Sequence, residues 1–395
     1  MTLKISKERP FVDYYNKHNI IPTSQNIKNF KQFLFQRNYL YTTLGLPLNF
    51  LHNKEIIEFG PGGGWNAVAT SFFKPKLYVF VDASNKSVDE LKKKIRNKKI
   101  NSKKIVINKL DIFNYKNKKK FDCAIAEGII PGQLKPAKML KHISNSVKKN
   151  GILITTTHSG CSLLSEVCRR LLRIKIIKES YNFEESINMA SNIFYPHLKS
   201  LNSSTRPIRD WVLDSILSEY SGDKIIFNIS DALDCLEKNF YFYQSQPSFL
   251  IDDRWYKHVK IKNKNTNDLL KEQYSRIETS FLDYRVPLFD VLKIDNKKLE
   301  NIEFLSVMAC KVHNNMIKTN SYKKIDNFLY ILKNIEQALP KEFQITKNSI
   351  NDYIMDLPKF INQKLQMTNI LSNKIFTDFK NWWGRGQQYS SFIKK

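Results

Sequence analysis

The sequence predicts a doubly wound α/β domain with a mostly parallel sheet. Three observations support this prediction: five short apolar runs recur between residues 51 and 161, helical patterns separate them, and glycines follow the first run. Strands of about five apolar residues are typical of a parallel sheet that helices cover on both faces. The strands are expected at 55–59, 77–81, 105–110, 123–126 and 152–156, with helices at 65–73 and 88–95 among others.

Helical additions are expected around this core. A helical N-terminal cap should occupy residues 1–50, where Ser24 caps a helix that runs to Leu44. The aromatic-rich run at 240–249 predicts the last hairpin of the sheet. The expected organisation is a core at 51–161 and 231–262, a helical insertion at 162–230, and a helical C-terminal region at 263–395.

The composition leaves the partner open. The chain has 395 residues and a formal net charge of +27, and lysines with abundant Asn and Ile give it the bias of an AT-rich genome. Phosphate recognition favours Arg, so nucleic acid is an unlikely partner, and the lysines at 116–120 are interpreted as solvated loop charge. A weaker alternative is that the charge steers an anionic substrate or holds the protein near acidic lipid.

The N-terminal residues and the cysteines favour a cytoplasmic protein. The first residues lack the apolar stretch of a signal peptide, and no apolar run approaches the ~20 residues of a membrane-spanning helix. Five cysteines without C-x-x-C spacing fit reduced, buried thiols. We expect a cytoplasmic protein with no membrane span and no metal site.

A glycine-rich loop follows the first strand and opens the next helix. Its pattern is Glu58-x-Gly60-x-Gly62-x-Gly64. Glycine allows a tight turn and close approach of the backbone to a ligand, and the helix start offers free N–H groups. A dinucleotide site of the form G-x-G-x-x-G would need its third glycine at position 65, which is Trp65, so that class is excluded.

Acidic residues follow the second and third strands. Asp82 is placed to accept hydrogen bonds from both ribose hydroxyls of a nucleoside, although Asp at a strand end is also a common turn former. Asp111 is placed to receive an adenine amine, and its alternative role is a helix N-cap. Together with Glu58, they describe a nucleoside pocket at the carboxyl edge of the sheet.

The segments 56–64, 78–84, 110–113, 121–128 and 151–157 resemble the ordered motifs of class I S-adenosylmethionine (SAM)-dependent methyltransferases. The resemblance implies that Glu58 lies near the methionine part of SAM and that Gly60, Pro61, Gly62 and Gly64 form the loop beneath the cofactor. It further implies ribose binding by Asp82 and cofactor or substrate contacts by Glu127. For the adenine it implies contacts with Ala83, Ser84, Asp111 and Ile112.

The flanking segments bear a fainter resemblance to bacterial methyltransferases of this class with long helical extensions. We associate those proteins with surface-glycan or secondary-metabolite loci. The segments are 11–22, 206–212 and 382–386. This resemblance implies no particular acceptor.

Several residues are candidates for the reaction itself. A general base is needed only for a protonated acceptor, and His158 after the fifth strand is the best placed, with Glu127 second. The alternative roles are a local hydrogen bond for His158 and a structural or cofactor contact for Glu127. Arg37 and Tyr41, one helical turn apart, are candidates for binding the cofactor carboxylate or the substrate, or else form a solvated Arg beside a packed Tyr.

The expected helical insertion and the expected C-terminal region contain further candidates. Arg206 and Arg209 are placed to clamp an anionic acceptor, or else to form a salt-bridged helix start with Asp210. Trp382, Trp383 and Arg385 are placed to stack on a sugar or aromatic acceptor, or else the aromatic pair docks the C-terminal tail.

The expected function is methyl transfer from SAM to a small-molecule or glycan acceptor by in-line displacement. One alternative, suggested only by net charge, is a methyltransferase acting on RNA or protein. Another is a non-catalytic SAM-binding or scaffold protein, because a fold does not fix a function.

Overall fold

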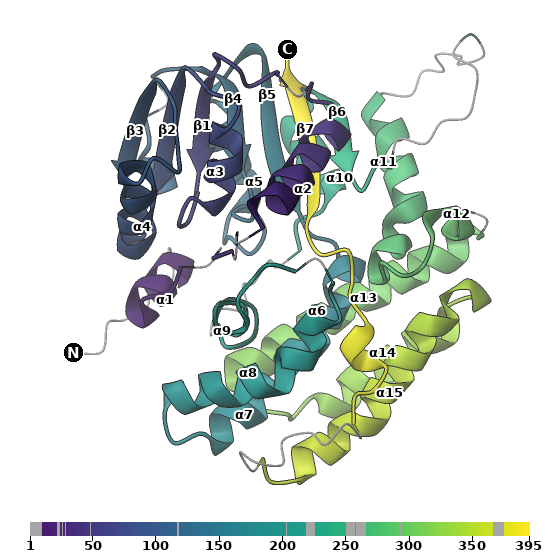
Figure 1. Ribbon diagram of the computed structural model, residues 1–395. Coiled ribbons are helices and arrows are strands. Elements are labelled where there is room, and N and C mark those ends of the chain that lie inside the picture. The colour runs from purple at the N-terminus through teal and green to yellow at the C-terminus, as the bar shows by residue number, and fades with distance from the viewer. Residues whose placement is uncertain are drawn as a thin grey trace. The chain divides into compact units, whose positions relative to one another are not determined.

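The computed structural model describes residues 10–21, 24–25, 27, 29–47, 49–116, 118–202, 204–218, 226–249, 257, 266–292, 294–365 and 375–395. The chain forms two compact units, of which the first contains the sheet (Figure 1). Unit 1 comprises Met1–His158, Lys224–Ser275 and Gln387–Lys395, and unit 2 comprises Ser159–Asp223 and Arg276–Gly386.

Unit 1 is built on a seven-stranded sheet of order β3-β2-β1-β4-β5-β7-β6. Five strands, β1 to β5, run parallel, and β7 pairs antiparallel with both β5 and β6. The order reverses between β1 and β4, so the carboxyl ends of β1 and β4 flank the switch point where ligands bind in such sheets. The bounds are β1 Glu55–Phe59, β2 Leu77–Asp82, β3 Lys104–Lys109, β4 Phe121–Ala126, β5 Val147–Thr157, β6 Phe240–Gln246 and β7 Gln388–Lys394.

The fold class is as predicted: a doubly wound, mostly parallel Rossmann-like sheet. All five predicted parallel strands are present, although β5 begins five residues earlier than expected. The expected hairpin at 240–249 is wrong, because β6 ends at Gln246 and its partner is β7 at the C-terminus. The prediction of a helical region up to residue 395 is therefore wrong for Gln388–Lys394.

Helices cover both faces of the sheet in unit 1. α2 (Phe30–Thr43), α3 (Trp65–Ser71) and α4 (Asn85–Arg96) contribute to one hydrophobic core with inward residues of β1, β2, β4 and β5. On β4 and β5, α5 (Pro136–Ser144) packs together with α10 (Ile229–Leu236). Right-handed crossovers from β1 to β2 and from β4 to β5 run in opposite directions, which places α3 and α5 on opposite faces.

The N-terminal segment is helical in two pieces. α1 (Pro10–His18) precedes α2, whose N-cap is Asn29: its side chain accepts a hydrogen bond from the Gln32 N–H at 3.0 Å. The expected cap at Ser24 is wrong, because Asn29 lies directly before the first helical residue and Ser24 lies five residues too early. Residues 250–256 and 258–262 of the expected core lie outside the described residues.

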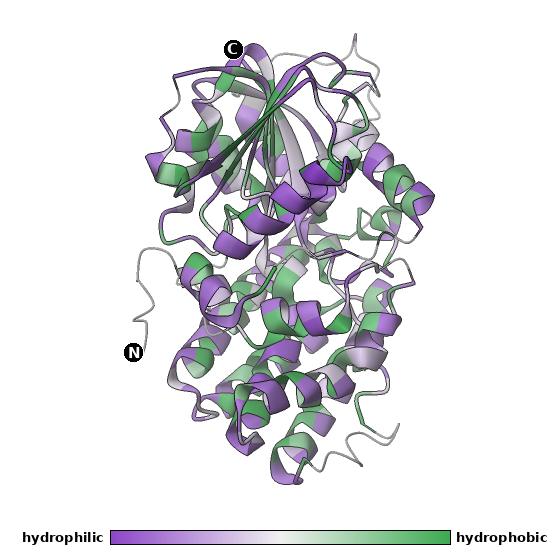
Figure 2. Cartoon of the chain, turned by 60° about the vertical axis from the view of Figure 1, so that its left-hand side comes forward, coloured by the Kyte–Doolittle hydropathy of each residue, from purple (hydrophilic) through white to green (hydrophobic). Residues whose placement is uncertain are grey.

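Unit 2 is helical. Hydropathy alternates around its helices, so each presents an apolar stripe and a polar stripe, whereas the central parallel strands β1, β2 and β4 are mostly apolar (Figure 2). None of the helices in the described part of the chain has the length and apolarity needed to cross a bilayer. The main helices of unit 2 are α6 (Gly160–Leu171), α7 (Arg173–Glu179), α8 (Phe183–Lys199), α13 (Asn296–Thr319), α14 (Ile325–Ala338) and α15 (Gln344–Asn362).

Candidate cofactor site

The glycine loop between β1 and α3 has the backbone that its sequence requires. Gly60, Gly62 and Gly64 have φ values of 63°, 55° and 72°, a region that residues with a Cβ seldom adopt. A Cβ at Gly60 would meet the Ile129 side chain at 2.5 Å, and one at Gly64 would meet Leu91 at 2.5 Å. Pro61 is buried within the loop. The chain can therefore pass close to a ligand here only because these positions are glycine.

Asp82, the last residue of β2, holds this loop. Its Oδ2 accepts a hydrogen bond from the Gly62 N–H at 3.1 Å, and its Oδ1 accepts one from the Ser84 N–H at 2.8 Å. A carboxylate oxygen has two lone pairs, so each oxygen keeps one for a further donor. Burial raises the pKa of Asp82 to about 6, against the effect of the two backbone hydrogen bonds.

The residues expected around an adenine lie at the ends of β2 and β3. Ser84 is the N-cap of α4, Ala83 precedes it and is half-buried, and Asp111 is the N-cap of the short 3₁₀ helix Ile112–Asn114. One oxygen of Asp111 accepts from the Phe113 N–H at 2.9 Å. The capping role considered for Asp111 is thus present, and its adenine contact stays a prediction.

Glu58 lies beneath the loop, on β1. It is 4% exposed and accepts a hydrogen bond from the hydroxyl of Tyr78 on β2. Burial raises the pKa of Glu58 to about 7, and the nearby carboxylates of Glu127 and Asp82 act in the same direction. A carboxyl with this pKa is ready to ionise beside a cation.

Glu127 follows β4 and forms a bidentate ion pair with Arg37 of α2. The Arg37 Nη2 and Nη1 atoms lie 2.6 and 3.0 Å from Glu127 Oε1 and Oε2, and Asn66 Nδ2 lies 2.9 Å from Oε2. Both charged side chains are 8% exposed. The structure thus brings together two residues that the sequence suggested separately.

Arg37 also contacts Tyr41, and part of its guanidinium is unused. Nη2 donates to the Tyr41 hydroxyl at 3.1 Å, and that hydroxyl shares a 2.6 Å hydrogen bond with Thr70. Burial would lower the pKa of Arg37, but the Glu127 carboxylate raises it well above its ordinary value. The Arg37 Nε atom is buried and has no hydrogen-bond partner among the described residues. A buried donor of this kind is costly unless a ligand accepts from it.

The ends of β4 and β5 complete this edge. The Gly128 N–H donates to Thr156 Oγ1 at 2.8 Å, and the His158 N–H donates to the Phe227 carbonyl at 2.9 Å. Burial lowers the pKa of His158 to about 4. The imidazole is therefore neutral at pH 7 and offers a nitrogen lone pair.

The candidates in unit 2 are engaged within that unit. Arg206 pairs with Asp214 at 2.9 Å and Arg209 pairs with Glu184 at 2.6 Å, so the expected partner Asp210 is wrong. Their binding of an anionic acceptor stays a prediction. Trp382 and Trp383 are 0% and 4% exposed, which contradicts open stacking surfaces and supports docking of the tail.

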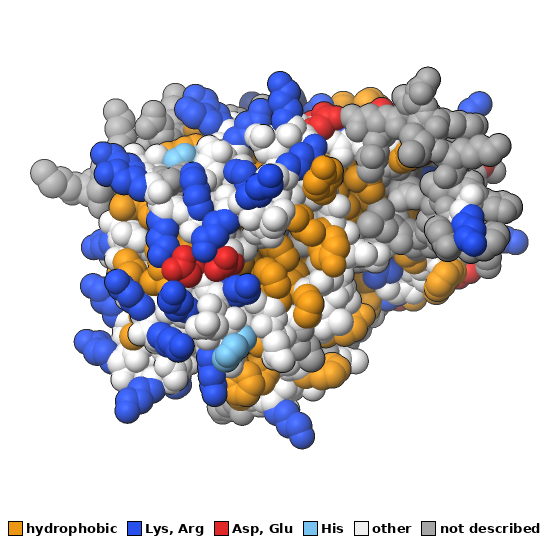
Figure 3. All heavy atoms as spheres, turned by 90° about the horizontal axis from the view of Figure 1, so that it is seen from above, with side chains coloured by type: hydrophobic (Ala, Val, Ile, Leu, Met, Phe, Trp, Pro, Cys, Tyr) orange, Lys and Arg blue, Asp and Glu red, His pale blue; other side chains and the backbone are white. Residues whose placement is uncertain are grey.

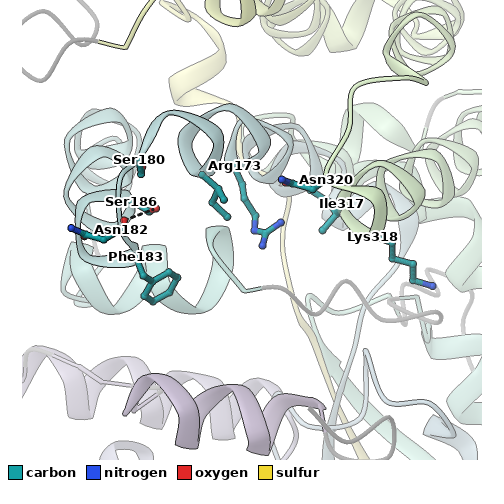
Figure 4. A pocket seen from close by; sticks show the side chains of 9 residues that line it. Arg173, Ser180, Asn182, Phe183, Ser186, Ile317, Lys318 and Asn320 are labelled. Atoms are coloured by element: carbon teal, nitrogen blue, oxygen red, sulfur yellow. Dashed lines mark hydrogen bonds between the residues drawn. The ribbon is translucent and has the colours of Figure 1, made fainter. Parts of the chain in front are cut away.

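A cavity of about 630 Å³ also lies in unit 2, and none of the predicted residues lines it. Arg173 of α7, Phe183 of α8 and Ile317 of α13 are among its walls (Figure 4). Arg173 Nε donates to the Leu217 carbonyl at 3.3 Å.

Sequence reasoning missed three members of the polar network in unit 1: Asn66, Thr70 and Tyr78. A tyrosine on a strand with buried neighbours needs a partner for its hydroxyl, and this signal was sufficient to find Tyr78 but was not used. Asn66 and Thr70 lie four residues apart on α3, but nothing in the sequence distinguishes them from solvent-facing polar residues.

The residues at this edge fit SAM. A Cβ at Gly60 or Gly64 would clash with neighbouring side chains, so the tight turn of the loop requires glycine there. The Asp82 oxygens retain acceptor capacity for a ribose diol, and buried carboxyls suit the positive charges of a sulfonium and an ammonium. The unpartnered Arg37 Nε suits a carboxylate.

Comparisons with known proteins concern the fold. No family model matches the chain, and no curated protein matches it in sequence. Its structure is similar to that of PKMT2 from Rickettsia typhi, with 20% identity and a TM-score of 0.39, over 63% of this chain and 50% of that chain. The match thus spans only half the length of the Rickettsia protein.

Two further solved structures are similar over smaller parts of the chain. Magnesium protoporphyrin IX methyltransferase from Synechocystis PCC 6803, with bound SAM, matches at 16% identity and a TM-score of 0.30, over 40% of this chain and 78% of that chain. The N-methyltransferase NodS from Bradyrhizobium japonicum, with S-adenosylhomocysteine, matches at 12% identity and a TM-score of 0.29, over 37% and 74%.

Proposed function

We propose that unit 1 binds SAM at the carboxyl edge of its sheet and that the protein is a methyltransferase for a small-molecule or glycan acceptor. The observation that carries the proposal is the link between the glycine loop and Asp82. Three glycines with positive φ bring the backbone close to a ligand, and the carboxylate that fixes them keeps acceptor capacity for a ribose.

Each part of the cofactor has a proposed partner. Asp82 binds the ribose, while Ala83, Ser84, Asp111 and Ile112 surround the adenine. Arg37 binds the methionine carboxylate through its free Nε, and Glu127 holds the guanidinium in place. Glu58 lies nearest the cationic part, where its ionisation is favoured by positive charge.

Bound SAM supplies a methyl group that its sulfonium already activates. The chain contributes alignment and exclusion of water, and orientation of bound reactants can supply ~7–11 kcal/mol. α1 supports this enclosure: a Cβ at Gly63 would meet Ile21 at 2.8 Å, so the segment after α1 lies against the glycine loop.

The general base, where the acceptor needs one, is His158 in this proposal. Glu127 is a poorer choice, because its two oxygens already accept three hydrogen bonds from Arg37 and Asn66. His158 is neutral at pH 7, and its ring nitrogens have no hydrogen-bond partner among the described residues. The low pKa of His158 makes it a weak base. It is therefore best suited to accept a proton that the acceptor releases as the bond to the methyl group forms.

The experiment is a screen of nucleotide-sugars and glycolipid intermediates with methyl-labelled SAM, read by mass. We expect label in one of these pools, with turnover lost in Asp82→Ala and kept in Asp89→Ala, an exposed aspartate on α4. Label that enters RNA or protein instead would contradict the acceptor class. Binding of SAM without transfer to any pool would indicate a non-catalytic protein.

A further inference from the structure

The positive charge of the chain is concentrated in the sheet domain. Residues 51–158 contain 22 lysines and arginines but only eight aspartates and glutamates, which gives about half of the net charge of +27. Three of those acids, Glu58, Asp82 and Glu127, are buried at the carboxyl edge. A genome-wide bias toward lysine does not explain such a concentration, because it would act on all parts of the chain alike.

Within unit 1, exposed lysines gather at the amino edge of the sheet, where the parallel strands begin. Lys74 and Lys76 precede β2, Lys103 and Lys104 lie at the start of β3, and Lys118 and Lys119 precede β4. This face is seen in Figure 3, where blue side chains dominate and few red ones interrupt them. The chain thus presents its charge on the side of the sheet opposite the candidate cofactor site.

The same edge receives charge from the other strands. Lys149 lies near the start of β5, Lys238 precedes β6, and Lys395 follows β7, which runs in the opposite direction. Adjacent strands lie ~4.8 Å apart, so a set spread over seven strands is roughly 30 Å wide. The patch therefore extends from β3 to β6, the two edge strands of the sheet.

The acids at this edge neutralise little of it. Glu55 accepts from Lys119 at 2.9 Å and from Lys148 at 3.1 Å, and Asp122 also accepts from Lys148 at 3.1 Å. Glu237 lies near Lys395, whose Nζ donates to its carbonyl at 2.8 Å. Of the lysines at this edge named so far, only Lys119 and Lys148 have an acidic partner among the described residues, so the others are available to interact with an anionic partner.

We infer that the amino edge of the sheet is a docking face for an anionic membrane surface. A broad set of lysines suits lipid headgroups, which need point charges and no fixed geometry. Nucleic-acid recognition favours Arg forks, stacking rings and a groove. Phe72, at the end of α3 and 59% exposed near Lys74, offers an apolar ring for the headgroup region. Docked this way, unit 1 directs the carboxyl edge of its sheet away from the membrane surface.

The test is flotation of the full chain with phosphatidylcholine vesicles that contain or lack phosphatidylglycerol. We expect binding only to the anionic vesicles and release by salt. The variant Lys76→Gln/Lys103→Gln/Lys104→Gln/Lys149→Gln should lower the partition coefficient by roughly 600-fold, because each lysine near an anionic surface contributes about fivefold. The control Lys311→Gln/Lys323→Gln/Lys324→Gln/Lys364→Gln removes the same charge from exposed positions in unit 2 and should bind as the parent does.

Three results would overturn the inference: no binding to anionic vesicles, equal loss in both variants, or salt-sensitive binding of single-stranded RNA with no binding of vesicles. SAM affinity is expected to be unchanged in the four-lysine variant. A failure of membrane docking is thereby distinguished from a failure of the proposed cofactor site.

Discussion

Two buried arginines, one in each unit, make opposite use of their donors. Arg169 of α6 donates to the carbonyls of Ser165, Phe379, Lys380 and Trp382 and to His197. Its partners are neutral, and burial lowers its pKa. Arg37 pairs with the carboxylate of Glu127, which raises its pKa despite burial, and its Nε has no partner in the described part of the chain.

The difference separates an arginine whose donors are used within the protein from one that retains a donor for the proposed cofactor carboxylate. Arg169 has used its donors to fix the segment that contains Trp382, with Trp383 stacked at 3.7 Å from its guanidinium. Arg37 is held rigidly by its partners but keeps one buried donor. Burial alone therefore does not identify a binding residue, and the proposal for Arg37 rests on its unused donor beside the glycine loop and the carboxylates of the candidate site.

The largest effect is expected for Arg169→Met. Removal of its donors leaves several buried carbonyl oxygens without partners, at a cost of about 3 kcal/mol or more in the free energy of unfolding. Urea unfolding followed by tryptophan fluorescence measures this, since Trp211, Trp382 and Trp383 lie in unit 2. If Arg169→Met keeps its stability and loses SAM affinity instead, the assignment of Arg169 to a structural role and of Arg37 to cofactor binding is contradicted.

Arg37→Met should act on affinity in a ligand-specific way. The parent is expected to prefer SAM over decarboxylated SAM by about 10- to 100-fold, because a hydrogen bond to a charged group contributes roughly 1.5–3 kcal/mol. The variant should lose that preference, while Arg96→Met, an exposed arginine on α4, should keep it. Calorimetry with both ligands measures the ratio, and a preference that survives in Arg37→Met removes Arg37 from carboxylate binding.

SAM affinity should fall by about tenfold between pH 8 and pH 6. The raised pKa values of Glu58, about 7, and Asp82, about 6, mean that both carboxyls gain protons in this range and lose their attraction for a cation. The sign is opposite for folding: a raised carboxyl pKa contributes stability that is present at low pH and is lost as the pH rises through 6 to 7. Titration in Glu58→Gln should flatten the upper part of the affinity profile, and an unchanged profile would contradict the role of Glu58.

The smallest effect is expected for Arg209→Ala. Arg209 and Glu184 have half-exposed and exposed side chains, 50% and 61%, and exposed ion pairs contribute about 0.2–1 kcal/mol. Thermal unfolding should therefore change little. A large loss of turnover at unchanged stability would place the anionic group of the acceptor at Arg209 and would sharpen the contrast with Arg169.

The parallel part of the sheet could be predicted because its strands are apolar and a glycine loop marks the first crossover. β7 could not, since Gln388–Lys394 is short and half polar, and its partners β5 and β6 lie more than 140 residues earlier in the chain. The acidic residues at the strand ends could also be predicted, because each apolar run shows in the sequence where its strand ends. Their partners did not: the pair of Arg37 with Glu127 joins residues 90 positions apart, and only the fold shows that they meet.

Calorimetric titration of the parent protein and Asp82→Ala with SAM and S-adenosylhomocysteine tests the cofactor site most directly. We predict that the parent binds both ligands and that Asp82→Ala binds SAM about 100-fold more weakly, since two hydrogen bonds to a carboxylate are lost. Asp89→Ala should bind as the parent does. A parent protein that binds neither ligand, or equal affinities in the parent and Asp82→Ala, would contradict a SAM site at the carboxyl edge of the sheet.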